Sequence, residues 1–226
     1  LENVVRKLSG IYLDFYPGTK YSYATTDYDI LGLIIQTVSG ETYEDFMREK
    51  ILEPLGLYHT YAIRSQIEDS NLISKGYKKE FLQVKEYNAP VYRGNTPAGY
   101  IISSAEDMLR WMQIQMGLIK LPDSYEKLIE KSHIGDNTVS PVNDYYYAAG
   151  WNVHIRGEMI AHSGANPNYS SVMIMNNQGV GICILSNLNS NAANYIATTF
   201  FNLIYGRDIG SYEDDLYKKM DNIFTA

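Results

Sequence analysis

The tripeptide His162-Ser163-Gly164 brings together residue types that can carry out chemistry. An imidazole can exchange a proton near neutral pH, and a serine hydroxyl can bind a polar substrate group or attack it. The tripeptide follows a short apolar stretch, Met159 to Ala161, and its glycine allows a ligand to approach the backbone closely. We therefore predict that His162-Ser163-Gly164 forms one wall of an active-site cleft.

A second pattern, Ser124-Tyr125-Glu126-Lys127, places a lysine one helical turn behind a serine, as a serine nucleophile with its base would require. The same residues have a simpler interpretation, because Asp123 followed three residues later by Glu126 is typical of a helix capping box. Four-residue matches of this kind also arise by chance. We interpret the segment as the start of a helix.

The histidines and the cysteine do not indicate a metal site. His59, His133 and His154 lie far apart in the sequence and lack the spacing to a second histidine or a carboxylate that zinc sites show. Cys183 is the only cysteine, so neither an intrachain disulfide nor a multi-cysteine metal site can form. We expect no metal and no other cofactor.

Composition excludes several classes of protein. The chain has 226 residues, of which 45% are hydrophobic and 20% are charged, as in ordinary globular domains. A net charge of -7 without a cluster of lysine and arginine argues against a nucleic-acid partner. The longest apolar runs are far shorter than the roughly 20 residues that cross a bilayer, so we expect no membrane span in this chain.

The strand pattern that must position His162 lies between Gly150 and Asn187. Alternation of apolar and polar residues predicts strands over Ala149 to Ile155, Tyr169 to Met175 and Val180 to Leu185, with the stretch at Met159 between the first two. Glycine and asparagine supply the turns between them. We predict an antiparallel meander.

Helices are predicted mainly before this meander. Starts are indicated at Thr26, Thr42, Ser104 and Asp123, each followed three residues later by an acidic residue, and a last helix is predicted over 191–205. The apolar residues predicted to face inward are Tyr28, Leu31, Ile35 and Val38 in the first helix and Tyr195, Ile196, Thr199, Phe200, Leu203 and Ile204 in the last. Between Tyr61 and Asn95 we expect irregular structure with one hairpin strand at Phe81 to Tyr87.

This order of elements predicts an α+β fold. We expect a mainly helical part over residues 1–136, an antiparallel sheet with a closing helix over 137–207 and a loosely packed tail over 208–226, together forming one domain.

Seven ordered motifs resemble those of the serine beta-lactamase-related hydrolases, which include class C beta-lactamases, penicillin-binding proteins, DD-peptidases, D-aminopeptidases and esterases. The resemblance extends from about Phe15 to Phe201. The motifs are Phe15-Tyr16-Pro17-Gly18-Thr19, Tyr23-Ala24-Thr25 with Tyr28 and Leu31-Gly32, Val38-Ser39-Gly40, Ile51-Leu52 with Pro54-Leu55-Gly56-Leu57, Pro97-Ala98-Gly99, Gly150-Trp151 and His162-Ser163-Gly164.

The resemblance implies roles for individual residues. Tyr23 would be the phenolic acid and base beside a serine nucleophile, and His162 would supply an electropositive, proton-relaying wall. Ser163 and Gly164 would line the substrate site, with Ser163 binding a substrate carboxylate, and the amide of Ala165 would be one oxyanion donor.

The sequence departs from the family pattern at two points. Thr25 stands where the family usually has asparagine, so an amide that would hold the substrate is replaced by a hydroxyl. The family's Ser-x-x-Lys motif should precede Tyr23, and residues 1–22 do not contain it. Ser124 to Lys127 follows Tyr23, which is a further reason to set it aside.

Two functions therefore stay open. The chain is either the C-terminal portion of a serine hydrolase that acts on a peptide, a D-amino-acid amide, a beta-lactam or an ester, or a non-catalytic recognition module that keeps the cleft without the nucleophile. The expected partners are a small-molecule or peptide substrate and either a second copy or the missing N-terminal segment, because the family's N-terminal strands pair beside the strand corresponding to Val180 to Leu185. The family implies an extracytoplasmic location, although no signal segment is visible after Leu1.

Overall fold

The computed structural model describes residues 1–81 and 83–207. The main helices are α1 (Glu2–Arg6), α2 (Thr25–Ser39), α3 (Tyr43–Phe46), a π-helical segment η1 (Met47–Leu52), α4 (Glu53–Leu55), α5 (Thr96–Gly99), α6 (Ala105–Gln115), α7 (Asp123–Ser132) and α8 (Ala192–Ile204). Short 3₁₀ turns are η2 (Arg64–Gln66), η3 (Ser70–Leu72) and η4 (Arg93–Asn95). The strands are β1 (Tyr77–Glu80), β2 (Gln83–Glu86), β3 (Tyr145–Tyr147), β4 (Asn152–His154), β5 (Met159–Asn166), β6 (Tyr169–Asn176) and β7 (Gly181–Ser186).

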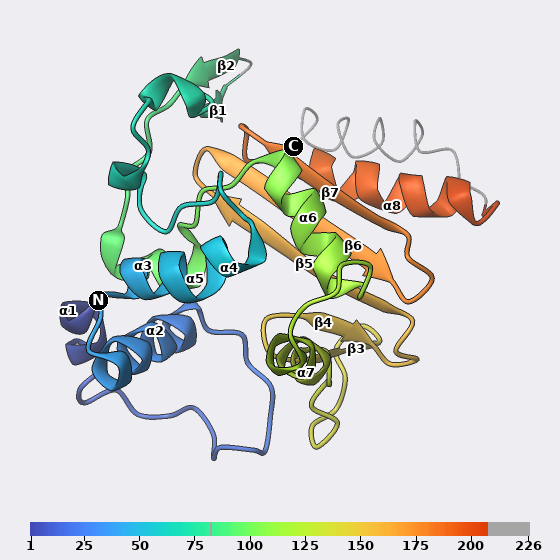
Figure 1. The fold of residues 1–226 in the computed structure, drawn as a ribbon, viewed down its shortest axis with the longest axis horizontal. Helices are drawn as coiled ribbons and strands as arrows, with labels where there is room; N and C mark the ends of the chain where they lie inside the picture. Colours follow the sequence, from blue (N-terminus) through green and yellow to red (C-terminus); the bar gives the residue numbers. More distant parts are fainter. Residues whose placement is uncertain (82, 208–226) are drawn as a thin grey trace.

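The central element is a five-stranded antiparallel sheet in the order β3-β4-β5-β6-β7. Helix α8 covers one face of the sheet and α6 the other (Figure 1). Alternate residues of β6 serve the two layers: Val172 packs with Ala193 and Ala197 of α8, whereas Met173 packs in a cluster with Met112 of α6. The predicted α+β fold is confirmed. The division of the chain into a helical part and a sheet part at residue 136 stays a prediction. Helix α6, from the helical part, shares a hydrophobic core with the sheet.

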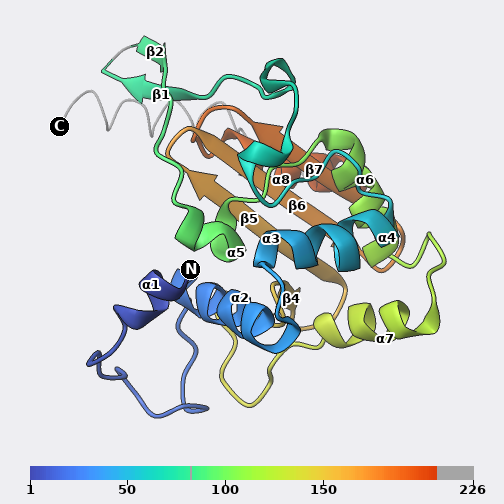
Figure 2. The same ribbon diagram turned by 60° about the vertical axis from the view of Figure 1, so that its left-hand side comes forward.

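Helices α2 and α5 lie beside the C-terminal end of strand β5 (Figure 2). Helix α2 packs on α5 at Gly32, where a Cβ atom would lie only 2.3 Å from Cγ of Pro97. Asp29 of α2 is fully buried and accepts a hydrogen bond from Nδ2 of Asn95 (3.1 Å). Asn166, the last residue of β5, donates from Nδ2 to the carbonyl of Gly99 in α5 (2.9 Å). These contacts fix α2 relative to α5, and α5 relative to the sheet.

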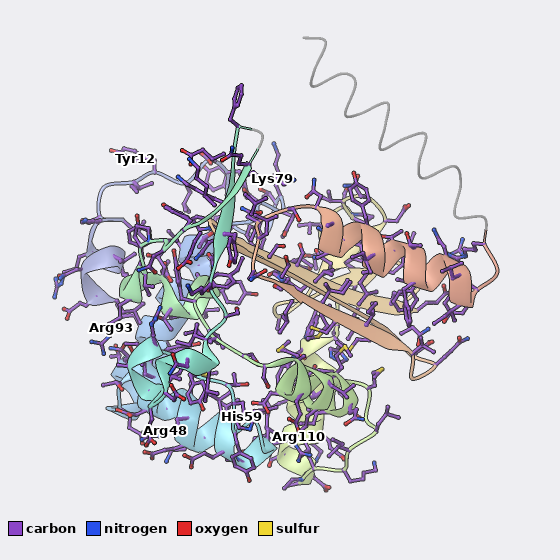
Figure 3. The ribbon with its side chains drawn as sticks, turned by 90° about the horizontal axis from the view of Figure 1, so that it is seen from above. Tyr12, Arg48, His59, Lys79, Arg93 and Arg110 are labelled. Atoms are coloured by element: carbon purple, nitrogen blue, oxygen red, sulfur yellow. The ribbon has the colours of Figure 1, made fainter. Side chains whose placement is uncertain are left out.

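Helix α6 joins the sheet to the segment after α4. The buried carboxylate of Asp107 accepts hydrogen bonds at 2.7 Å from the backbone N–H of His59 and from the Thr60 hydroxyl. Arg110 donates from Nε to the carbonyl of Leu55 (2.6 Å), and Figure 3 labels this arginine and His59. A charge-assisted bond to buried backbone groups is stronger than a neutral one, so these two side chains set the position of α6.

Strand positions agree with the prediction in the meander and differ at its edges. The first predicted strand is shorter, Asn152–His154, because Gly150 adopts φ +88° in a turn. The predicted stretch at Met159 continues through the polar residues to Asn166 as β5. Strand β3 was not predicted, and the hairpin strand expected at Phe81 to Tyr87 is a pair, β1 and β2, with Phe81 in the turn between them.

The predicted caps at Thr42 and Ser104 are confirmed, since each side chain accepts a hydrogen bond from the N–H three residues later. The cap predicted at Thr26 is wrong: α2 begins at Thr25 after Ala24, and Asp29 is buried in a tertiary contact. The capping box at Asp123 is also wrong, since α7 begins there after Pro122 without a side-chain cap.

Two predicted helix faces are wrong. Leu31 and Val38 of α2 are exposed, while Asp29 and Gly32 are buried. In α8 the buried residues are Ala193, Ala197 and Phe201, and Ile196, Leu203 and Ile204 are exposed. In α8 small residues approach the sheet closely, a choice that hydrophobicity alone does not reveal.

Strand β7 lies at the edge of the sheet, as expected for Val180 to Leu185. Helix α1, near the start of the chain, packs against α2. The tail over 208–226 lies outside the described residues, so pairing of β7 with a further segment or a second copy stays a prediction. No helix in the described part of the chain combines the length and apolar character that a bilayer crossing requires.

The contact between Gly32 and Pro97 should be sensitive to one methyl group. We expect Gly32→Ala to lower the free energy of unfolding by about 1–3 kcal/mol, because proline is rigid and the two helices would have to separate. Urea denaturation measures the change. Gly99→Ala is the matched control, since a Cβ there has nothing within 4 Å. Equal stabilities of the two variants would contradict this packing.

Candidate active site

The structure brings Tyr23 and His162 together from two elements that lie far apart in the sequence. Tyr23 lies in the extended segment before α2, and His162 lies in the middle of β5 opposite Met173 of β6. Their ring centroids are 6.4 Å apart with an interplanar angle of 41°. Tyr23 is 53% exposed, whereas His162 is half-buried. The tyrosine is therefore accessible to a substrate, while the imidazole forms the floor beneath it.

Tyr147 of β3 completes this site, and sequence reasoning did not assign it a role. Its ring lies 5.9 Å from that of Tyr23 and 6.4 Å from that of His162, centroid to centroid, in edge-to-face arrangements. Its hydroxyl is 3.0 Å from the hydroxyl of Tyr28 in α2. Tyr21 also packs on it, with ring centroids 5.3 Å apart. The only signal in the sequence was the run of tyrosines just before the Gly150-Trp151 motif.

Burial decides the charge of these groups. It lowers the pKa of His162, and an interaction with the backbone of Ser163 opposes this only in part. Burial and then the hydrogen bond to Tyr28 raise the pKa of Tyr147 well above that of an ordinary tyrosine. Near neutral pH the imidazole is therefore mainly uncharged. A neutral imidazole can accept a proton, and the role expected for His162 stays a prediction.

Ser163, Gly164 and Ala165 follow His162 along β5 and are exposed. Strand β4 pairs with β5 only at Ile160 and Ala161, whereas β6 pairs along the whole length of β5. Among the described residues, no strand therefore lies beside 163–165 on the side away from β6. Glycine is favoured at position 164 for a steric reason, since a Cβ atom there would lie 2.6 Å from Oγ of Ser171.

The other candidate residues lie as follows. Thr25 is exposed as the first residue of α2, two positions from Tyr23. Ser124 and Lys127 are exposed on α7, and Tyr125 between them donates from its hydroxyl to the carbonyl of Lys50 (2.9 Å). These positions agree with a surface helix.

Two further features concern ligands. Among residues 1–81 and 83–207, no group of three or more His, Cys, Asp or Glu side chains could hold a metal ion. A cavity of about 270 Å³ lies between Leu1, α2, α3 and η4, and none of the candidate site residues lines it. The candidate site is therefore the exposed surface around Tyr23 and His162 and not this cavity.

Protonation of His162 should be visible in stability. Because its pKa is lower in the folded chain, the unfolded chain binds more protons as the pH falls, so the stabilising contribution is fully present above about pH 6.5 and is lost at lower pH. We expect His162→Gln to reduce the loss of unfolding free energy between about pH 7 and pH 5 by on the order of 1 kcal/mol in urea denaturation. His59→Gln, at an exposed position, is the control. Parallel curves for native chain and His162→Gln would contradict the buried, neutral imidazole.

Comparison with known proteins connects this geometry to a family. A family model described as Beta-lactamase matches residues 2–204. Protein flp of Staphylococcus aureus (strain MRSA252) is 32% identical over 196 residues, covering 84% of this chain and 38% of that protein. The chain thus spans well under half the length of this curated relative.

Solved structures agree in fold. The octameric penicillin-binding protein homologue from Pyrococcus abyssi superposes with a TM-score of 0.80 at 24% identity, covering 92% of this chain and 48% of that one. A beta-lactamase/D-alanine carboxypeptidase from Pseudomonas syringae gives a TM-score of 0.71 at 17% identity, covering 84% and 60% respectively. The family model, which matches nearly the whole chain, shows that this chain belongs to the serine beta-lactamase-related family.

Proposed function

We propose that this chain supplies two walls of an acyl-transfer site, in a serine hydrolase that cleaves an amide or ester bond through an acyl-enzyme. The observation that carries the proposal is the placement of Tyr23 and His162, with ring centroids 6.4 Å apart and drawn from elements far apart in the chain. A reacting group bound beside this pair would have a phenol and an imidazole within reach.

Tyr23 is assigned the proton transfer. Its exposed ring can approach a nucleophilic serine and the leaving group of a substrate, and a phenol can donate and accept a proton. In the first step it would take the proton of the serine hydroxyl and pass it to the leaving amine or alcohol. In the second step it would activate the water that hydrolyses the ester formed with the enzyme.

His162 is assigned a relay and orienting role. With its pKa lowered by burial, the neutral imidazole can accept a proton from Tyr23 directly or through one water. A permanently charged lysine at this place would instead stabilise a tyrosinate by its fixed charge. We therefore assign His162 on strand β5 a role in proton transfer.

We assign substrate binding to the exposed end of β5. Along an antiparallel strand, alternate residues direct their N–H and C=O groups to one side, so the edge beside 163–165 can bind an extended acyl chain. We assign the amide of Ala165 as an oxyanion donor and the Ser163 hydroxyl as a contact for a substrate carboxylate. Thr25 would hold the substrate amide with one hydroxyl.

Substrates of this site are peptides, D-amino-acid amides, beta-lactams or esters, all of which expose a carbonyl carbon to a serine. The whole protein's activity depends on a nucleophile that residues 1–22 do not supply. That observation also supports a second candidate function, a recognition module that binds such ligands without cleaving them. The two differ in whether an upstream Ser-x-x-Lys segment completes the site.

Covalent labelling separates these possibilities. We expect this chain alone to form no adduct with a fluorescent penicillin or a fluorophosphonate, because no serine before Tyr23 is paired with a lysine. Gel fluorescence and intact mass measure the adduct. Stoichiometric labelling that maps to Ser124 would show that the motif on α7 is the nucleophile and that the assignment above is wrong.

The complementary arm supplies the missing part. We expect fusion to an upstream family segment that contains Ser-x-x-Lys to restore labelling, and Tyr23→Phe in the fusion to slow it by about 10²–10⁴-fold. Tyr125→Phe, which also loses one hydroxyl hydrogen bond but lies on α7, is the matched control. A folded fusion that binds penicillin reversibly without an adduct would instead favour the recognition module.

A further inference from the structure

A hydrogen bond between two tyrosines joins the two walls of the candidate site. The Tyr28 hydroxyl, from the first turns of α2, lies 3.0 Å from the Tyr147 hydroxyl on β3, and 119 positions separate the two residues in the sequence. The bond therefore connects the helix that follows Tyr23 to the sheet that contains His162.

The local structure is built to place Tyr147. Directly after β3 the chain turns at Gly150, where the N–H of Ala148 donates to the carbonyl of Trp151 (2.7 Å). Gly150 has φ +88°, and a Cβ atom there would lie 3.6 Å from the Tyr28 hydroxyl. A side chain at this position would be strained by the positive φ, although its Cβ would make only an ordinary van der Waals contact with the hydroxyl. The glycine thus permits the tight turn that follows β3.

The Tyr147 ring touches both assigned groups. Its ring centroid is 5.9 Å from that of Tyr23 and 6.4 Å from that of His162, and Tyr21 packs against it as well (5.3 Å). The three rings of Tyr23, Tyr147 and His162 are thus in mutual contact. A shift of Tyr147 would move the phenol and the imidazole relative to each other.

We propose that Tyr28 and Tyr147 form a hydroxyl clamp that sets the width of the site, with Tyr147 as a positioning residue that holds Tyr23 at its working distance from His162. This role rests on the proposed acyl-transfer function, whereas the geometric part can be tested without turnover. Tyr147 acts through the two rings that it contacts and has no assigned contact with the reacting atoms.

The clamp persists through the neutral pH range. The titratable groups in ring contact with His162 are Tyr23 and Tyr147, and those that interact with Tyr147 are Tyr21, Tyr23, Tyr28 and His162. Burial, followed by the bond to Tyr28, keeps the pKa of Tyr147 well above neutral, so its proton stays in place.

The test measures the pKa of His162 by NMR titration of the histidine ring protons in Tyr28→Phe, Tyr147→Phe and the double variant, with His162→Gln assigning the signal. Each single variant keeps its ring and loses the clamp. We expect the pKa of His162 to rise toward its ordinary value in each, since a wider site admits water. The double variant should match the single variants, because one bond is lost in all three.

Two controls separate a clamp from general loosening. His133, whose pKa is also lowered by burial, packs edge-on against Trp151, and its pKa should not change. Tyr125→Phe should leave His162 unchanged. An unchanged His162 pKa in both folded single variants, shifts that add in the double variant, or an equal shift of His133 would each overturn the clamp. If Tyr147→Phe does not fold, Tyr28→Phe breaks the same bond and decides the question alone.

Acylation assays distinguish the clamp from the proposed function. In the fusion that carries Ser-x-x-Lys, we expect Tyr28→Phe to slow acylation with little effect on reversible binding of the substrate. A native fusion that never acylates, together with the expected rise in the His162 pKa, would refute the proposed function and leave the geometric clamp intact. A normal acylation rate in Tyr28→Phe would refute the positioning role.

Discussion

The contact of Tyr147 with Tyr23 and His162 is the interaction on which the candidate site depends, because it joins the segment before α2 to the sheet. Other contacts also hold α2 in place relative to the sheet. The close packing of Gly32 on Pro97 sets α2 against α5, and the bond from Asn166 to the carbonyl of Gly99 ties α5 to the end of β5. Both walls of the site are thus positioned by rigid elements, as a site that must hold two groups at a fixed separation requires.

The same packing of α2 and its preceding segment against the sheet affects the protonation of His162. By burying His162 among aromatic rings it lowers the pKa of the imidazole, so that the group is mainly uncharged near neutral pH and is free to accept a proton. Tyr23 stays exposed beside it, and just beyond lies the side of β5 that no strand of residues 1–81 and 83–207 pairs with. In the proposed function, proton transfer, oxyanion binding and substrate pairing would lie along one line of the surface, as acyl transfer by a serine nucleophile needs.

The sequence predicted the α+β fold, the caps at Thr42 and Ser104 and the β6 strand, because these depend on local chemistry and on regular alternation. It did not predict β3, since three consecutive tyrosines show no alternation, or the full length of β5, since His162-Ser163-Gly164 is polar. The buried face of α2 was also missed, because Gly32 and Asp29 are buried by tertiary contacts that hydrophobicity does not indicate. His162 was predicted from its residue type and its place after an apolar stretch, and its role and that of Tyr23 came from family resemblance, whereas Tyr147 became apparent only from its position in space.

The most direct test of this account is whether Tyr23 and His162 share one site in solution. Nuclear Overhauser effects between isotope-labelled histidine and tyrosine rings report that proximity in the folded chain. We predict a cross-peak from the His162 ring to a tyrosine that disappears in Tyr23→Phe, and a second cross-peak that disappears in Tyr147→Phe. A folded chain in which the His162 signals show no contact that depends on Tyr23 would contradict the central claim.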